Sequence, residues 1–214
     1  MTKIKRLIHF TFAVALAMVV LPCRSFSQDP TNLTPVPGTI QSLTDDAMTV
    51  QTDKGIVSIR IVRPLVIYAS GPSNLAHVKP NSFVGITSVK QPDGTELASE
   101  IHVIAEELRG VGEGSYMMGT VDKAGNANRM TNGAVSDSRM TNGSVEPSKS
   151  SSALTIKFQG GTQTITIPPD VPVTEIARTH RTLSPGAKVY VLAIKQDDGT
   201  YTTNKAVLRD DPSK

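Results

Sequence analysis

The sequence predicts an all-β protein made of two tandem small barrels, and three observations carry this prediction. The segment Lys90–Thr95 returns 105 residues later as Lys195–Thr200, which indicates an internal duplication. Apolar and polar residues alternate with period two in both halves, as they do on half-buried strands. Asp-Gly pairs that suit tight hairpins separate these runs. Short antiparallel strands in modules of this size close most economically into OB-like β-barrels, which leave no exposed sheet edge.

The chain begins with the pattern of a secretory signal peptide, which we expect to precede both barrels. Three basic residues lie within the first six positions, an almost unbroken apolar run covers residues 12–21, and Ser25 and Ser27 stand ahead of Gln28. We expect cleavage after residue 27 and export to the periplasm. The apolar run is shorter than the roughly 20 residues that a bilayer span needs, so we expect no transmembrane segment in the mature chain. An uncleaved N-terminal anchor is the alternative.

Removal of residues 1–27 changes both the charge and the cysteine content. The signal peptide holds four of the 22 lysines and arginines and none of the 19 acids, so the mature chain has 18 basic residues and a formal charge of −1. It offers no cluster of lysine and arginine to face phosphates, which argues against nucleic-acid binding. The only cysteine, Cys23, is also removed, which excludes disulfides, thiolate metal sites and cysteine nucleophiles.

The two modules are expected at residues 37–108 and 142–210, after an N-terminal tail at residues 28–36. Each should contain five or six short strands, with one helical turn at Asn74–Val78 in the first and a counterpart at Arg181–Ser184 in the second. Because a module of roughly 70 residues is marginal alone, we expect a pseudo-twofold contact between the two. The period-two pattern places Val57, Ile59, Ile61 and Val84 inside the first barrel and Ile165, Ile167 and Val189 inside the second.

Residues 109–141 form a glycine-rich linker that contains a decapeptide duplication. The segment Arg129–Val135 recurs as Arg139–Val145, with alanine replaced by serine at one position. The offset of 105 residues assigns the later copy to the start of the second module. The earlier copy is therefore expected to loop out or to pair along a sheet edge.

Several of these segments together carry a resemblance to a known family. With the signal peptide, they make the chain similar to exported bacterial proteins of unknown function that are built from OB-like β-barrel repeats, some of which are labelled metal ABC transporter permease. The resemblance covers almost the whole mature chain and implies two barrels, whereas the duplicated linker departs from the family. The permease label implies at most a gene neighbourhood, because no membrane span is expected. The segments are Pro37–Ile40, Leu75–Pro80, Glu107–Gly114, Met140–Gly143 and Pro185–Val189.

The glycine-rich stretch from Arg109 to Gly114 is the candidate binding site, with Arg109 and Glu113 as its polar residues. A phosphate loop is one interpretation, but the stretch lacks the lysine and hydroxyl residue that end a P-loop. The other interpretation is a bend in which Arg109 and Glu113 pair with each other or with the second module.

A metal site and an enzyme site are weaker hypotheses. His77, His102 and His180 lack the close spacing of a metal site, and the recurrence of Met130 as Met140 follows from the decapeptide duplication. No serine elbow occurs, and adjacent carboxylates on a strand point to opposite faces. We expect an exported, non-enzymatic periplasmic binding or scaffolding protein with no cofactor, an unknown ligand and an unknown envelope partner. The alternative is a periplasmic metal-binding accessory protein linked to metal transport.

Overall fold

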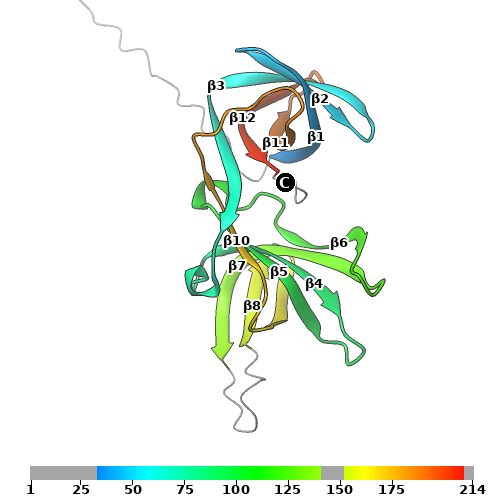
Figure 1. Cartoon of the computed structure of the whole chain (residues 1–214), viewed down its shortest axis with the longest axis vertical. Coiled ribbons are helices and arrows are strands. Elements are labelled where there is room, and N and C mark those ends of the chain that lie inside the picture. The colour runs from blue at the N-terminus through cyan, green and yellow to red at the C-terminus, as the bar shows by residue number, and fades with distance from the viewer. Residues whose placement is uncertain (1–32, 141–151, 210–214) are drawn as a thin grey trace, which may run out of the picture.

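The computed structural model describes residues 33–140 and 152–209, and these residues form an all-β protein (Figure 1). The expected signal peptide, most of the expected tail and residues 141–145 of the later decapeptide copy lie outside the described residues. Two short 3-10 turns, η2 (Leu75–His77) and η3 (Glu106–Leu108), accompany the strands. The strands are β1 (Thr34–Leu43), β2 (Ala47–Thr52), β3 (Gly55–Pro72), β4 (Phe83–Lys90), β5 (Glu96–Ile104), β6 (Gly114–Val121), β7 (Ala127–Met140), β8 (Ser152–Phe158), β9 (Gly161–Ile167), β10 (Val173–Arg178), β11 (Lys188–Lys195) and β12 (Tyr201–Leu208).

Five strands from the two ends of the described chain close into one barrel, the first barrel. Strands β1, β2 and β3 form an antiparallel meander. β3 then pairs in parallel with β12, β12 pairs with β11, and β11 returns to β1. The barrel shown at the top of Figure 1 therefore joins blue and cyan strands to orange and red ones.

The central strands form a second ring with the same order of pairings. β7, β8 and β9 form an antiparallel meander, and β4 lies between β7 and β5. A single parallel pair, Leu97 with Thr166, joins β5 to β9 and closes the ring. β6 is an additional strand that pairs with β7.

The registers of the two rings match position by position. Gly38 of β1 lies opposite Val189 of β11, as Gly133 of β7 lies opposite Val84 of β4. The β1–β2 ladder shifts register after Ile40, and the β7–β8 ladder shifts after the equivalent Val135. The two sets of strands therefore follow one geometric plan.

Strands β3 and β10 join the rings across an antiparallel contact. Ser70 lies opposite Ile176 at the centre of this contact, and residues on either side pair reciprocally, Tyr68 with Arg178 and Pro72 with Thr174. The register is thus symmetric about the pair of Ser70 and Ile176.

The strand pairings differ from the expected modules, because the described strands of each expected module complete their rings with strands of the other. Val189 packs in the first barrel with Ile59 and Ile61, whereas Val84 packs in the second ring with Ile165 and Ile167. The expected partners of these two valines are therefore exchanged. The cause is β3, which has 18 residues and carries the chain out of the first barrel before β4 begins.

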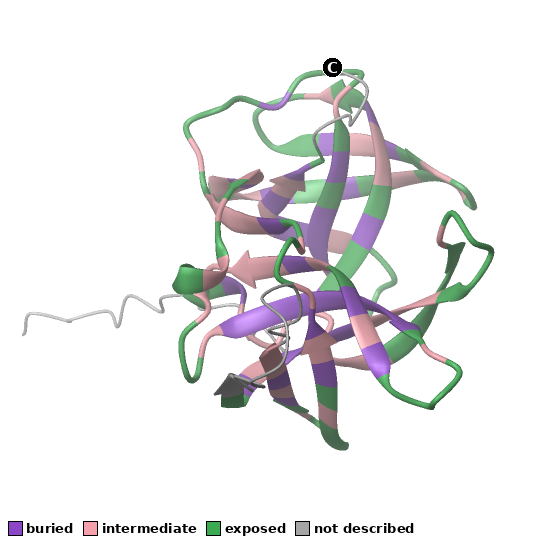
Figure 2. Cartoon of the chain, turned by 60° about the horizontal axis from the view of Figure 1, so that its bottom comes forward, coloured by how far each residue is buried: buried purple, intermediate pink, exposed green. Residues whose placement is uncertain are grey.

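A third apolar cluster fills the seam between the two rings. Tyr68, Leu108 and Leu192 are buried there together with Leu33. Figure 2 shows buried positions in both rings and alternation of burial along many strands, as the period-two pattern requires. The halves are thus joined by packing as well as by exchanged strands.

One of the two expected helical turns is confirmed. The turn η2 follows Asn74, whose side-chain oxygen accepts a hydrogen bond from the Ala76 N–H at 3.0 Å. Residues 181–184 are not helical. Thr179 accepts a similar bond from the Arg181 N–H at 3.2 Å, but the residue 105 positions after Leu75 is His180, which is exposed.

The expected linker is largely strand. β6 and β7 occupy most of residues 109–141, and the earlier decapeptide copy, Arg129–Val135, lies in β7 and pairs with β4. The earlier copy therefore takes the place that the offset of 105 residues assigned to the later one. Within the described residues, no helix is long and apolar enough to cross a membrane.

Candidate functional site

Arg109, the first predicted binding residue, is held by contacts within the chain. Its guanidinium donates to the Glu106 carboxylate and, from Nη2, to the Asn81 carbonyl oxygen at 2.7 Å. The guanidinium also lies over the Phe83 ring, 5.6 Å from its centre. Bonding between the two charged groups lowers the pKa of Glu106 and raises that of Arg109. Arg109 thereby ties η3 to the start of β4.

Glu113, the second predicted residue, makes a different contact. Its Oε1 accepts a hydrogen bond from the Gln159 N–H at 2.8 Å, in the turn between β8 and β9. The stretch from Arg109 to Gly114 is therefore a bend that binds other parts of the chain, one of them in the second half. The structure does not bring Arg109 and Glu113 together in a hydrogen bond.

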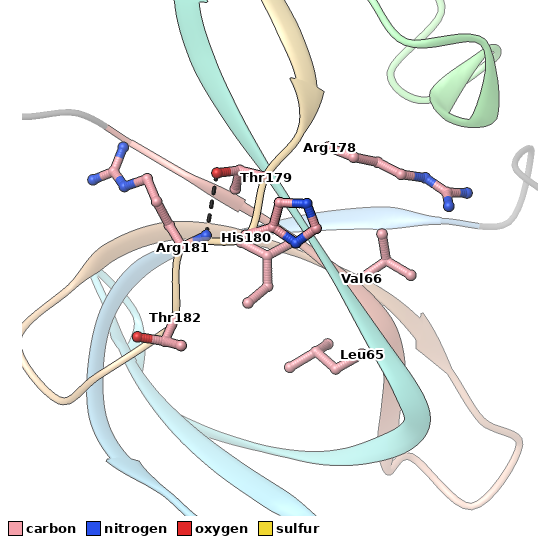
Figure 3. Close-up of a pocket in the computed structure, with 8 residues that line it drawn as sticks. Leu65, Val66, Arg178, Thr179, His180, Arg181 and Thr182 are labelled. Atoms are coloured by element: carbon pink, nitrogen blue, oxygen red, sulfur yellow. Dashed lines mark hydrogen bonds between the residues drawn. The ribbon is translucent and has the colours of Figure 1, made fainter.

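A groove in the first barrel is the better candidate site (Figure 3). It consists of two adjoining hollows of about 380 and 510 Å³, which share Leu65, Ile67 and Thr182. One wall comes from the first half of the chain and the other from the second half. The lining residues are Leu43, Thr44, Asp45, Ile61, Arg63, Leu65, Val66 and Ile67 from the first half, and Arg178, Thr179, His180, Arg181, Thr182 and Leu183 from the second.

The groove exists because β3 loses its neighbours in the middle of its length. The ladder with β2 ends at Arg60, and the ladder with β10 begins at Tyr68. On the opposite side, the register with β12 jumps from Ile61 to Val66. Residues 62–65 therefore have no partner in these ladders, and they bulge out of the β3–β12 pairing opposite the single residue between Thr203 and Lys205.

The equivalent place in the second ring is filled. Leu75 and Val78 of the η2 turn pack against the core there, together with Val171. At the positions 105 residues later, Leu183 is buried in the first barrel but His180 is exposed. A leucine that plugs one ring is thus replaced by a polar side chain at the open groove of the other.

The rim of the groove is mostly cationic. Arg63 donates from Nη2 to Asp45 Oδ1 at 2.9 Å, and this exposed pair stands at one end. Arg178 lies at the other end, where its Nη2 is 3.0 Å from Glu107 Oε1. In Figure 3, Arg178 and Arg181 point to opposite sides with His180 between them. Among the described residues, Asp45 is the only carboxylate that lines the groove.

A charged cluster lies behind the Arg178 end, in the seam between the rings. Lys205 Nζ donates to the Glu107 carbonyl oxygen at 2.9 Å, and burial lowers the pKa of Lys205. The Tyr68 side chain is fully buried, and its hydroxyl has no hydrogen-bond partner among the described residues. Burial raises the pKa of Tyr68, an effect that the nearby Arg178 guanidinium partly offsets. In the seam, Lys205 therefore contacts the Glu107 carbonyl group, and Arg178 lies near the buried Tyr68 side chain.

Sequence reasoning also missed a polar cluster under β6. Glu96 is buried and accepts hydrogen bonds from Ser88 at 2.8 Å and from Arg129 Nε at 3.2 Å. Arg129 Nη1 reaches Ser115 Oγ of β6 at 3.4 Å. In the first barrel the positions equivalent to Ser88 and Glu96 are Ala193 and Tyr201. The cluster is specific to the ring that carries β6, and its contacts hold that strand in place.

The histidines that were weighed as metal ligands do not gather in the described residues. His77 Nδ1 lies 2.9 Å from Ser73 Oγ, and His102 Nδ1 lies 2.7 Å from Thr174 Oγ1. Within residues 33–140 and 152–209, no three histidine, cysteine, aspartate or glutamate side chains are placed to hold a metal ion. Met117 and Met118 are exposed on β6.

The comparisons with known proteins identify no relative. No protein-family model, curated protein or solved structure matches the chain. The resemblance to exported OB-like repeat proteins therefore stays a prediction.

Proposed function

We propose that this chain is an exported, non-enzymatic binding or scaffolding module that holds its ligand in the groove of the first barrel. The observation that carries this proposal is the difference between the two rings. The second ring closes the equivalent place with Leu75 and Val78, whereas the first leaves Leu65 and Ile67 beside open space. A matched pair of sites, one filled and one open, is what a duplicated scaffold with one binding site would present.

The chemistry of the groove supports binding rather than catalysis. Asp45, its lining carboxylate, already accepts from Arg63. The other polar lining residues are threonines, arginines and His180, which supply hydrogen bonds and positive charge. An apolar floor with a few convergent polar groups is the usual form of a small binding site.

The same proposal includes the origin and location of the molecule. We infer that an internal duplication produced two OB-like barrels that exchange strands, because their registers match and because, in each ring, a parallel pair joins the last strand of the meander to the second strand of the remaining hairpin. Residues 1–27 act as the signal peptide, and the mature protein works in the periplasm.

The dye 8-anilinonaphthalene-1-sulfonate tests the site, because it combines an apolar ring system with an anionic group. We expect saturable binding of one dye molecule to the folded protein. Thr182→Trp, which places a large side chain where the two hollows meet, should abolish it. Lys123→Trp, at an exposed turn between β6 and β7, is the matched control and should bind the dye normally.

Two results would contradict the proposal. One is the absence of dye binding to the folded chain. The other is equal binding by both tryptophan variants, which would place the dye elsewhere, for instance on the exposed apolar side chains of β6.

A further inference from the structure

We propose that the seam between the two rings binds a small oxyanion of the phosphate or sulfate type through Tyr68, Arg178 and Lys205. This seam site goes beyond the proposed function, because it does not depend on a ligand in the groove. Two features of the described residues carry the inference: three hydrogen-bond donors on one face of the sheet, and an unbalanced positive charge beside a buried hydroxyl group.

The three donor side chains lie on neighbouring strands and on the same face of the sheet. β3 lies between β10 and β12 here, and Tyr68 is the ladder partner of Arg178 on one side and of Val207 on the other. The register between β3 and β12 is regular from Lys205 onwards. Residues opposite each other in a ladder share a face, as do residues two apart on a strand. Arg178, Tyr68 and Lys205 therefore project together towards the seam.

Glu107 of the η3 turn lies over these side chains. Its Oε1 is 3.0 Å from Arg178 Nη2, and its carbonyl oxygen accepts from Lys205 Nζ at 2.9 Å. Burial lowers the pKa of Lys205, and Glu107 and Arg178 are the charged groups that act on it, in opposite directions. One carboxylate thus faces two cations, so these side chains leave one positive charge unbalanced.

The Tyr68 hydroxyl group needs an acceptor. The side chain is fully buried, and its hydroxyl has no hydrogen-bond partner among the described residues. Arginine and lysine side chains only donate, so neither Arg178 nor Lys205 can accept the hydroxyl proton. A buried donor without an acceptor costs free energy. An oxyanion supplies acceptors for all three side chains, and its charge balances the remaining cation.

The seam site is open to solvent at its Arg178 end. The Arg178 and Glu107 side chains are 60% and 45% exposed, and Arg178 and Val66 also line one hollow of the groove. A small ion can therefore reach the donors from the surface. A cation there would meet two like charges, and a neutral ligand would leave the positive charge unbalanced, so the arrangement favours an anion.

Inorganic phosphate and sulfate are the probes, added to the mature full-length protein in a buffer without other multivalent anions. We expect saturable binding of one ion, with amide NMR shifts centred on residues 66–68, 178 and 205–207. Tyr68→Phe removes only the hydroxyl and should weaken binding about tenfold, the usual loss for a hydrogen bond to a charged group. Tyr190→Phe, on β11, is the matched control and should bind both ions as the parent does.

Charge variants locate the ion. Lys205→Met keeps most of the apolar stem, removes the charge and should weaken binding about tenfold or more. Lys195→Met makes the same change at the exposed end of β11 and should have little effect. Glu107→Gln removes the carboxylate that competes with the ion for Arg178, so it should tighten binding. Weaker binding by Glu107→Gln would contradict the charge argument.

Thermal melts of Tyr68→Phe give an independent result. Without phosphate or sulfate, the variant should melt at or above the temperature of the parent, because it buries no unpartnered hydroxyl group. Phosphate should raise the melting temperature of the parent more than that of the variant, as binding to the folded state requires. A variant that melts lower without the ions would show that the hydroxyl has a partner within the chain, which would contradict the inference.

Octyl phosphate distinguishes a free ion from the head group of a larger ligand. Equal affinity for octyl phosphate and inorganic phosphate assigns the seam site to a free ion. Tighter binding of octyl phosphate that Thr182→Trp reverses assigns it to the head group of a groove ligand.

Two results would overturn the seam site. One is the absence of saturable phosphate and sulfate binding. The other is binding that neither Tyr68→Phe nor Lys205→Met weakens, which would place the ion elsewhere. The dye tests the groove separately, so a failure of the seam site leaves the proposed function standing.

Discussion

Gly38 and Gly133 lie at matching points of the two rings, and each is in contact with a neighbouring strand. A Cβ atom on Gly38 would collide with the Gln51 carbonyl oxygen and the Val50 side chain. A Cβ atom on Gly133 would collide in the same way with Lys157 and Ile156. The backbones therefore approach too closely for any side chain at these two positions.

We predict that Gly38→Ala and Gly133→Ala each lower the free energy of unfolding by about 1–3 kcal/mol, the usual cost of forcing extra volume into a packed site. Gly71→Ala is the control, because a Cβ atom there meets nothing within 4 Å. Urea denaturation with a common slope for all variants measures the differences. Equal stability of the three variants would show that the close approach is absent.

Asp93 and Asp198 lie in the turns of two equivalent hairpins and accept the same pair of hydrogen bonds. Asp93 Oδ1 accepts from the Thr95 N–H at 2.9 Å and from its hydroxyl at 2.7 Å. Asp198 Oδ1 accepts from the N–H and hydroxyl of Thr200 at 2.9 and 2.6 Å. The threonine hydroxyl contributes most to the lowered pKa of each carboxyl group.

We predict that Thr95→Val raises the pKa of Asp93 towards the ordinary aspartate value and leaves that of Asp198 unchanged. A folded-state pKa below the unfolded value stabilises the protein above the unfolded pKa, and this contribution is lost as the pH falls through the folded pKa. The free energy of unfolding of the variant should therefore fall less on acidification than that of the parent protein. Carboxyl carbon NMR titrations measure both groups in one sample, and an unaltered Asp93 titration would refute the assignment.

At the scale of elements, β6 pairs with β7 but nothing described pairs with the corresponding side of β1. Met130 and Asn132 of β7 lie opposite Tyr116 and Gly114 of β6. Their equivalents in β1 are prolines at positions 35 and 37, which have no N–H to donate. Prolines on an edge strand are a common protection against further pairing.

The position of the decapeptide was the part of the linker that the sequence predicted least well. Both copies read Arg-Met-Thr-Asn-Gly, so either can pair with β4 as far as residue types decide. In the structure the earlier copy pairs with β4, which places Gly133 opposite Val84. The alternative that the earlier copy pairs in a sheet was foreseen, but its role as a ring strand was not.

We predict that deletion of residues 130–139 preserves cooperative unfolding, with a melting temperature a few degrees lower. The deletion joins Arg129 to Met140, so the later copy rebuilds the strand. Gly143 would then take the place of Gly133, where no Cβ atom fits. Gly143→Ala should therefore destabilise the deleted chain by as much as Gly133→Ala destabilises the complete chain.

The stability of Gly133→Ala in the complete chain, measured with and without Gly143→Ala, decides whether the two decapeptide copies are interchangeable. If Gly133→Ala is mild alone but severe together with Gly143→Ala, the later copy replaces the earlier one in the strand. That result would contradict a fixed register for β7.

At the scale of the whole molecule, the sequence predicted the strands and their buried faces. It did not predict that each ring combines strands from both halves of the chain. The period-two pattern found Ile59, Ile61, Ile165 and Ile167 in the cores. It could not assign Val84 and Val189, because both begin similar strands that fit the same ladder. That choice depends on β3, which pairs with β2 at its start and with β10 at its end and so leads the chain away from its own barrel.

The same reason explains why the candidate site was not found from the sequence. The groove has one wall in residues 43–67 and the other in residues 178–183, and only the exchange of strands brings them together. The predicted residues Arg109 and Glu113 were found instead because glycine-rich stretches stand out in a sequence. Their contacts with Glu106 and Gln159 fix the bend between the halves.

Cross-strand proton NOEs in the isotope-labelled mature protein test the exchange of strands most directly. The structure predicts backbone NOEs between Gly38 and Val189 and between Gly133 and Val84, since these residues are ladder partners. If each half closed on itself, Gly38 would instead contact Val84. NOEs between Gly38 and Val84, without any between Gly38 and Val189, would contradict both the exchange and the groove that it builds.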